Sequence, residues 1–208
     1  MNKLTLVILV GALSMMLGAC SDSLDPDDGD DPIVTENFTS VDNGDGSFTT
    51  TANAGSMSDT EYVYFRFQGA AEAEPVDPSD SAAYDLAFLF ANINLNGGIN
   101  GTGGVELIYF DDSDFDVLTE APADGYITDL SNDDTGRAFN QGATGEQNGG
   151  WYHYTGPPDH QMVVVVDRYY LIHSVDGVYY KLHITSFATG GPSTPSELVF
   201  DWQEISAP

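Results

Sequence analysis

The sequence predicts an all-β protein, in which a single antiparallel β domain over residues 33–208 follows a signal peptide and an acidic tether. Short runs rich in Val, Ile, Tyr, Phe and Thr alternate with clusters of Gly, Asn, Asp and Pro, at intervals of roughly ten residues. The apolar periodicity of an amphipathic helix is hard to find. This pattern is typical of antiparallel sheets whose strands are joined by turns.

The N-terminus has the pattern of a bacterial lipoprotein signal. A single cationic residue, Lys3, precedes an apolar run over residues 4–16, and the sequence Leu-Gly-Ala-Cys then ends at Cys20. The run is too short to stay in a bilayer as a spanning helix, and small residues before the cut site are typical of an export signal. We therefore expect residues 1–19 to be removed and the mature chain to begin at Cys20.

Cys20 is the expected lipidation site. It is the only cysteine of the chain, whereas an exported protein that relied on disulfides would carry paired cysteines. The motif resembles the lipobox of bacterial lipoproteins, which implies acyl chains on the sulfur and on the amine, and several chains anchor firmly. The alternative is an ordinary cleaved signal with a chance cysteine. Ser21, rather than Asp, follows the cysteine, which by analogy favours the outer membrane. The Asp-rich stretch that comes next resembles the acidic sorting stretches of some surface-exposed lipoproteins.

The charge of the chain is strongly acidic. Asp and Glu number 33 against 5 Lys and Arg, one of which is Lys3 in the signal. Such a surface repels phosphate backbones, so nucleic acid is excluded as a partner. Anionic head groups are repelled as well, so the membrane contact is expected through the lipid alone.

Residues 20–32 form the lipidated cysteine and the tether. The sequence after Cys20 is nearly free of apolar residues and rich in Asp, so it cannot bury surface and is expected to stay extended. Its aspartates could also collect calcium, but a solvated spacer is the commoner role of such a composition.

The first half of the domain contains five predicted strand regions. Residues 37–41 and 47–51 form a hairpin around an Asn-Gly and Asp-Gly turn. In residues 61–67, apolar and polar side chains alternate, which places one face in the core. Residues 84–90 are apolar on both faces and indicate a central strand, and a Gly-rich loop over 96–104 leads into the strand 105–110.

The second half begins with residues 124–150, which contain no apolar run and are expected to form a long loop or a loose hairpin. An aromatic strand over 151–154, a turn over 156–160 and a strand over 162–166 follow. The clearest hairpin of the chain pairs 169–173 with 178–184 around the turn 175–177, and the strand 198–205 closes the domain.

Hydrolytic motifs are weak in this chain. No serine has a Gly-x-Ser-x-Gly setting, no His-Glu-x-x-His occurs, and the sole cysteine is at the anchor, so a catalytic activity is not expected. The histidines are more informative. His153 and His160 lie close to Met162, and imidazole and thioether groups bind haem iron. Trp151 and Tyr154 would supply the apolar walls that a porphyrin needs.

An ordinary hydrogen-bonded role remains the alternative for each histidine. His173 ends a strand beside the Asp-Gly turn, and its imidazole is expected to hydrogen-bond there. His183 alternates with Tyr179 and Lys181, which places it on the polar, solvated face of its strand.

The order of these landmarks resembles the HmuY family of haem-binding lipoproteins. The resemblance covers roughly residues 60–205. It rests on Tyr62 to Phe67 with Gly69, Tyr84 to Phe88, the glycines between Asn96 and Gly104, Trp151 to Tyr154, and above all Asp176 to Leu182 followed by Ile184 to Phe187. The family implies an all-β, surface-exposed, lipid-anchored protein that captures haem with two axial side chains and passes it to an outer-membrane receptor.

The leading expectation is therefore non-catalytic haem binding for iron acquisition, with iron ligands among His153, His160 and Met162. The rival is a surface binding module of the same fold that holds a glycan, a calcium ion or a protein partner. Exposed tyrosines and the polar loop 124–150 would suit that rival. A hydrolase is the least favoured interpretation.

Overall fold

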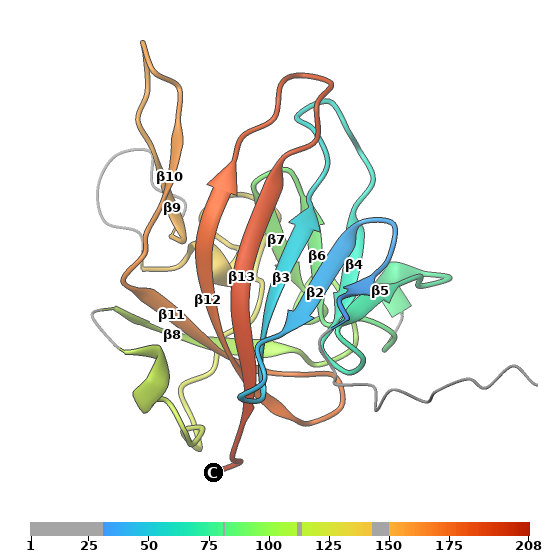
Figure 1. Cartoon of the computed structure of the whole chain (residues 1–208), viewed down its shortest axis with the longest axis vertical. Helices are drawn as coiled ribbons and strands as arrows, with labels where there is room; N and C mark the ends of the chain where they lie inside the picture. The colour runs from blue at the N-terminus through green and yellow to red at the C-terminus, as the bar shows by residue number, and fades with distance from the viewer. Residues whose placement is uncertain (1–30, 81, 112–113, 143–149) are drawn as a thin grey trace, which may run out of the picture.

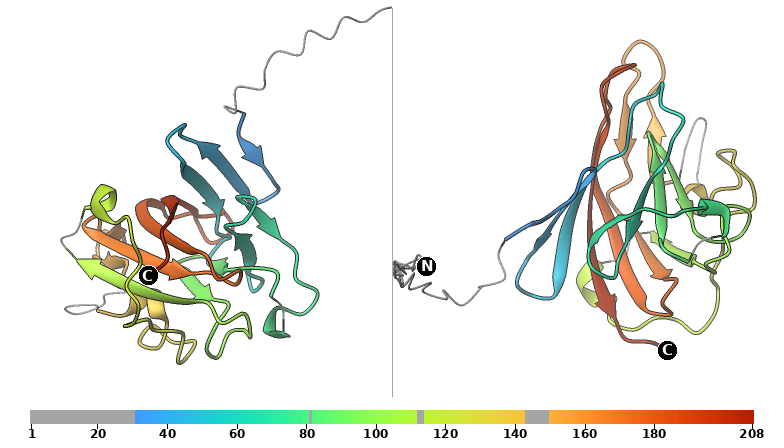
Figure 2. Two further views of the ribbon diagram at one scale, coloured as in Figure 1. Left: turned by 90° about the horizontal axis from the view of Figure 1, so that it is seen from below. Right: turned by 90° about the vertical axis from the view of Figure 1, so that its right-hand side faces the viewer.

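A computed structural model describes residues 31–80, 82–111, 114–142 and 150–208. Two antiparallel sheets face each other, and a separate two-stranded hairpin stands beside them (Figure 1; Figure 2). Within the described ranges there is no α-helix, only three 3₁₀ turns, so the predicted all-β fold is confirmed. None of the described helices is long and apolar enough to cross a membrane. Cys20 and the tether up to residue 30 lie outside the described residues.

The larger sheet has seven strands in the order β1-β2-β3-β13-β12-β11-β8, and every neighbouring pair is antiparallel. These strands are β1 (Ile33–Val34), β2 (Phe38–Asp42), β3 (Ser47–Asn53), β8 (Glu106–Asp111), β11 (Arg168–His173), β12 (Tyr179–Ala188) and β13 (Glu197–Ile205). The C-terminal strand β13 lies at the centre, between β3 and β12, and its alternate residues Leu198, Phe200 and Trp202 are buried, as the sequence predicts.

The smaller sheet has four strands in the order β5-β4-β6-β7. They are β4 (Val63–Arg66), β5 (Ala71–Ala73), β6 (Leu86–Leu89) and β7 (Asn92–Leu95), and the hairpin beside the sheets consists of β9 (Tyr152–Tyr154) and β10 (Met162–Val164). The 3₁₀ turns are η1 (Pro78–Asp80), η2 (Phe115–Val117) and η3 (Ala138–Asn140). β6 lies inside its sheet, as its two apolar faces predict.

Aromatic rings from both sheets form the core between the layers. Phe65 of β4 meets Phe200 of β13 edge to face, with ring centroids 5.5 Å apart. Phe88 of β6 stacks on Phe200 at 5.8 Å. Phe67 stacks on Tyr180 of β12 at 4.5 Å. Such pairs add to the apolar burial that holds the two sheets together. The alternation predicted for residues 61–67 is confirmed for Phe65 and Phe67, which are both buried.

Several predicted turns are confirmed. The hairpin β2–β3 has Gly44 and Gly46 at positive φ, as its Asn-Gly and Asp-Gly pairs require. In the turn between β11 and β12, Gly177 has φ of 75° and its amide donates to the carbonyl of Ser174 at 3.0 Å. The preceding residue, Asp176, forms an ion pair of 2.6 Å with Arg66 of the other sheet.

Gly177→Val is expected to lower the free energy of unfolding by about 1–3 kcal/mol. A Cβ atom at Gly177 would meet only the His173 ring, at 4.0 Å, so the cost comes from the left-handed backbone rather than from a clash. Thermal unfolding measures it, and Gly177→Asn is the matched control because asparagine tolerates this conformation. An unchanged melting temperature for the valine variant would contradict the turn geometry.

Two parts of the chain differ from the sequence prediction. Strand β7 and the short strand β5 had no clear pattern, because β7 mixes buried Asn94 with apolar residues and β5 has three residues. The predicted loop 124–150 is confirmed as non-strand over its described part, but it does not stay at the surface. Ala138 and Phe139 belong to the hydrophobic core and Asn140 is buried beside them, because η3 packs against β7 and β8.

Candidate functional site

The β9–β10 hairpin carries most of the predicted site residues. It lies beside the C-terminal end of β12 (Figure 1). The antiparallel register pairs Tyr154 with Met162 and His153 with Val163. Since directly paired residues share a face, Tyr154 and Met162 lie on one side of the hairpin and His153 on the other. Tyr154 and Met162 pack against the core, whereas His153 is exposed.

His160 lies next to Tyr154 at the start of β10. The Tyr154 hydroxyl and His160 Nδ1 form a hydrogen bond. The backbone of His160 has φ of 49°, and its amide donates to the carbonyl of Gly156 at 2.8 Å, which closes the turn. A contact at Nδ1 orients the imidazole and leaves Nε2 as the ligand atom, which is the usual arrangement of metal-binding histidines. The structure therefore brings Tyr154, His160 and Met162 together.

Trp151 and His153 are not part of that group. Trp151 is 1% exposed and packs edge to face on Phe187 of β12, with ring centroids 5.3 Å apart. Its ring is therefore buried against β12 and has no exposed face for a ligand. His153 lies on the face of the hairpin opposite to Tyr154, the hydrogen-bond partner of His160. In the described residues no group of three or more His, Cys, Asp or Glu side chains could hold a metal ion.

The other two histidines have structural contacts. His173 Nδ1 lies 3.3 Å from Glu106 Oε1, and its ring stacks on Tyr179 at 4.5 Å. His183 donates from Nε2 to the carbonyl of Val166 at 2.7 Å. His183 is half-buried, and the expectation that Lys181 shares a solvated face is wrong because Lys181 is only 3% exposed. The turn η2 covers this part of the sheet, and sequence alternation cannot show that a loop returns over a strand.

Every basic side chain of the described residues already has a partner. Arg66 pairs with Asp176 at 2.6 Å, Arg137 with Asp134 at 3.1 Å, and Arg168 with Asp111 at 2.6 Å, while Lys181 Nζ donates to the carbonyl of Phe115 at 2.8 Å. Lys181 also lies 4.3 Å from the centre of the Phe115 ring. Three of the four described Lys and Arg side chains are therefore already neutralised by an aspartate, and Lys181 lies against the Phe115 ring.

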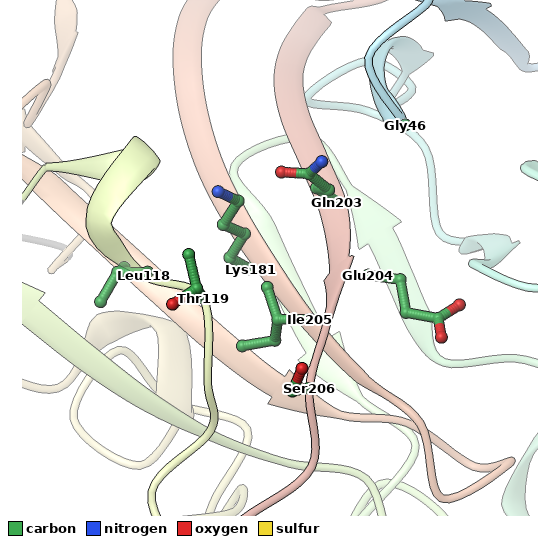
Figure 3. A pocket seen from close by; sticks show the side chains of 8 residues that line it. All are labelled: Gly46, Leu118, Thr119, Lys181, Gln203, Glu204, Ile205 and Ser206. Atoms are coloured by element: carbon green, nitrogen blue, oxygen red, sulfur yellow. The ribbon is translucent and has the colours of Figure 1, made fainter.

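A cavity of about 490 Å³ lies beside Lys181, where β12 and β13 meet the segment after η2. Figure 3 shows Lys181 and Gln203 next to each other on these two strands, with Thr119 and Ser206 below them. The hairpin residues Tyr154, His160 and Met162 do not line this cavity. Tyr154 and Met162 are half-buried and His160 is exposed, so the candidate ligand atoms lie at the surface of the hairpin.

Two buried aspartates connect the loops around the sheets, and sequence reasoning missed their role. Asp85 accepts hydrogen bonds from the amides of Phe67 and Val175, at 2.9 and 2.8 Å. Asp129 accepts from the amides of Leu95 and Ala138, at 2.8 and 2.7 Å. Burial raises the pKa of both carboxyl groups above the usual range, although these hydrogen bonds oppose the shift. The sequence signal for the structural role of Asp85 was that this charged residue interrupts an apolar run.

These features define a two-layer antiparallel β protein in which Tyr154 is paired with Met162 and hydrogen-bonded to His160 on one hairpin. The family model of the HmuY protein matches residues 58–202, more than half of the chain. The chain belongs to the HmuY family, as its sequence landmarks predict. No curated protein matches it.

Two solved structures share the fold at low sequence identity. A protein assigned as a lipoprotein from Bacteroides fragilis is 14% identical, with a TM-score of 0.52 over 79% of this chain and 94% of that one. A protein assigned as an HmuY-like haem-binding protein from Bacteroides vulgatus is 12% identical, with a TM-score of 0.51 over 80% of this chain and 96% of that one. At these identities the likeness concerns the fold.

Proposed function

We propose that this chain is a non-catalytic, lipid-anchored surface protein that binds haem for iron acquisition. The observation that carries the proposal is the Tyr154–His160 hydrogen bond beside Met162, in a chain of the HmuY family. Nε2 of His160 and the thioether of Met162 would bind the iron, and Tyr154 would orient His160 and pack on the porphyrin. The bound haem would be the source of iron for the cell.

The negative charge of the chain limits which interactions can supply affinity for haem. Haem carries carboxylates, the chain has a formal net charge of −28, and every described basic side chain is already paired. Long-range attraction therefore opposes the encounter. Affinity must come from iron ligation and from apolar contact with the exposed parts of Tyr154 and Met162, which are both half-buried. We accordingly expect haem association to speed up with added salt, because salt screens the repulsion.

Titration of the apo-protein with ferric haem tests the proposal. The wild type is expected to shift the Soret band and to show six-coordinate bands, because two protein side chains ligate the iron. His160→Ala is expected to weaken binding at least tenfold. His183→Ala is the matched control, since His183 lies on β12 of the larger sheet and its imidazole donates to the carbonyl of Val166. Absence of any Soret shift in the wild type would refute haem binding, and equal spectra for all three proteins would refute the ligand assignment.

The second ligand is tested with two further variants. Met162→Leu keeps the shape of the side chain and removes the sulfur, so the six-coordinate bands are expected to become five-coordinate. His153→Ala is expected to leave the spectrum unchanged, because this imidazole lies on the opposite face of the hairpin. A spectrum that changes with His153→Ala and not with Met162→Leu would assign the second ligand to His153.

We further propose that the protein passes its haem to an outer-membrane receptor. The exposed position of His160 on the hairpin favours this role, because a receptor could reach a ligand that is bound there. The lipid on Cys20 would keep the domain at the membrane, and the acidic tether would let it reach the receptor.

A further inference from the structure

A second cavity, separate from the hairpin, lies on the smaller sheet. Its volume is about 260 Å³. Its walls combine three tyrosines and three asparagines, namely Tyr62, Tyr64, Tyr84, Asn94, Asn100 and Asn132. No charged side chain lines it, although the chain contains 33 acidic residues. Tyrosines on and next to β4 and a residue of the polar segment 124–142 therefore line the same cavity.

The tyrosine rings form a fixed wall. The rings of Tyr64 and Tyr84 meet at an interplanar angle of 64°, with centroids 4.8 Å apart. The Tyr84 hydroxyl donates to the carbonyl of Pro78 at 3.1 Å and lies 3.2 Å from that of Asn100. Tyr84 is buried, whereas Tyr62 and Tyr64 are half-exposed and keep ring surface at the cavity. The wall therefore exists before any ligand binds, which lowers the entropy cost of binding.

Two of the three asparagine side chains, Asn94 and Asn100, are oriented by buried charged groups. Asn94 Oδ1 accepts from Arg137 Nε at 2.9 Å. Asn100 Nδ2 donates to Asp129 Oδ2 at 2.7 Å. Each bond uses one end of an amide, so Asn94 Nδ2 remains as a donor and Asn100 Oδ1 as an acceptor, without a partner among the described residues. A fixed donor and acceptor next to aromatic rings can hold a ligand that is both polar and apolar.

We propose that this cavity is a binding site for a neutral saccharide. A sugar ring presents an apolar C–H face that suits a tyrosine ring, and hydroxyl groups at its rim that suit oriented amides. The absence of lining charges favours a neutral sugar over an acidic one. The volume is slightly below the roughly 300–1,000 Å³ of drug-sized ligand sites, which fits one ring of a longer glycan with its neighbours in solvent. The site shares no residue with the proposed haem hairpin, so either proposal can fail alone.

Isothermal titration calorimetry of the mature full domain with three neutral probes, namely cellohexaose, maltohexaose and chitohexaose, tests the inference. We expect saturable binding of at least one of them, at least tenfold weaker affinity in Tyr62→Ala and in Asn132→Ala, and no binding of polygalacturonate. Tyr62 is half-exposed and Asn132 is exposed, so neither substitution removes core packing. Tyr169→Ala is the matched control, because it removes a half-exposed tyrosine from the larger sheet.

Three results would overturn the inference. The first is that none of the three neutral probes binds at millimolar concentration. The second is that Tyr62→Ala and Asn132→Ala bind as well as the wild type, and the third is that Tyr169→Ala weakens binding as much as they do. The haem titration is unaffected by any of these outcomes, so the two sites are tested independently.

Discussion

Asp129→Ala is expected to lower the free energy of unfolding by about 3–5 kcal/mol. The carboxylate is fully buried and accepts hydrogen bonds from the amides of Leu95 and Ala138 and from the side chain of Asn100. Its removal leaves buried donors without an acceptor, and each such donor costs about 1–3 kcal/mol. Urea unfolding followed by tryptophan fluorescence measures the loss, because both tryptophans are buried.

Asp124→Ala is the matched control for that variant. Asp124 belongs to the same polar segment but is exposed, so its removal is expected to leave the unfolding curve almost unchanged. Equal curves for Asp129→Ala and the wild type would show that the buried carboxylate does not hold β7 and the turn η3 together. Because Asp129 also orients Asn100, the same variant is expected to weaken saccharide binding.

Cys20→Ser is expected to move the protein from the membrane fraction to the soluble fraction. The variant removes the only thiol that can carry the lipid, and the strongly acidic chain has no electrostatic attraction to anionic head groups. Ultracentrifugation of lysed cells followed by immunoblotting measures the distribution. Thermal unfolding of the released protein is expected to match that of the domain without its N-terminus, since the tether separates the anchor from β1.

Ser21→Ala is the control for this experiment, because it changes the neighbouring residue and keeps the thiol. It is expected to stay in the membrane fraction. A Cys20→Ser protein that still sediments with membranes would show that the N-terminal motif is not a lipidation signal and that another part of the chain holds it there.

Much of the fold follows from local sequence signals. The hairpins β2–β3 and β11–β12 can be predicted from the sequence because Asn-Gly and Asp-Gly pairs interrupt alternating apolar runs. β6 can be predicted as an inner strand because both of its faces are apolar. The family landmarks depend on the same residues, so sequence alone also led to the HmuY family. Such signals act within one strand or one turn, where the side-chain period and the backbone preference decide the structure.

The sequence also indicated the residues of the candidate haem site, but not how they are grouped. His153, His160 and Met162 are close along the chain, and only the register of β9 with β10 shows that His153 lies opposite to the other two. A shift of one residue would exchange the faces, so composition cannot settle this point. The contact between Tyr154 and His160 depends likewise on the turn that brings β10 back to β9.

The sequence by itself determined the all-β class, the main turns and the family, because these depend on local patterns of apolar and turn-forming residues. The tertiary structure alone decided that Phe139 enters the core, that Lys181 is covered by η2, and that Tyr62 and Asn132 line one cavity. Each of these contacts joins segments far apart in the chain. They arise because each segment must bury apolar surface and pair its polar groups against whatever the fold places next to it.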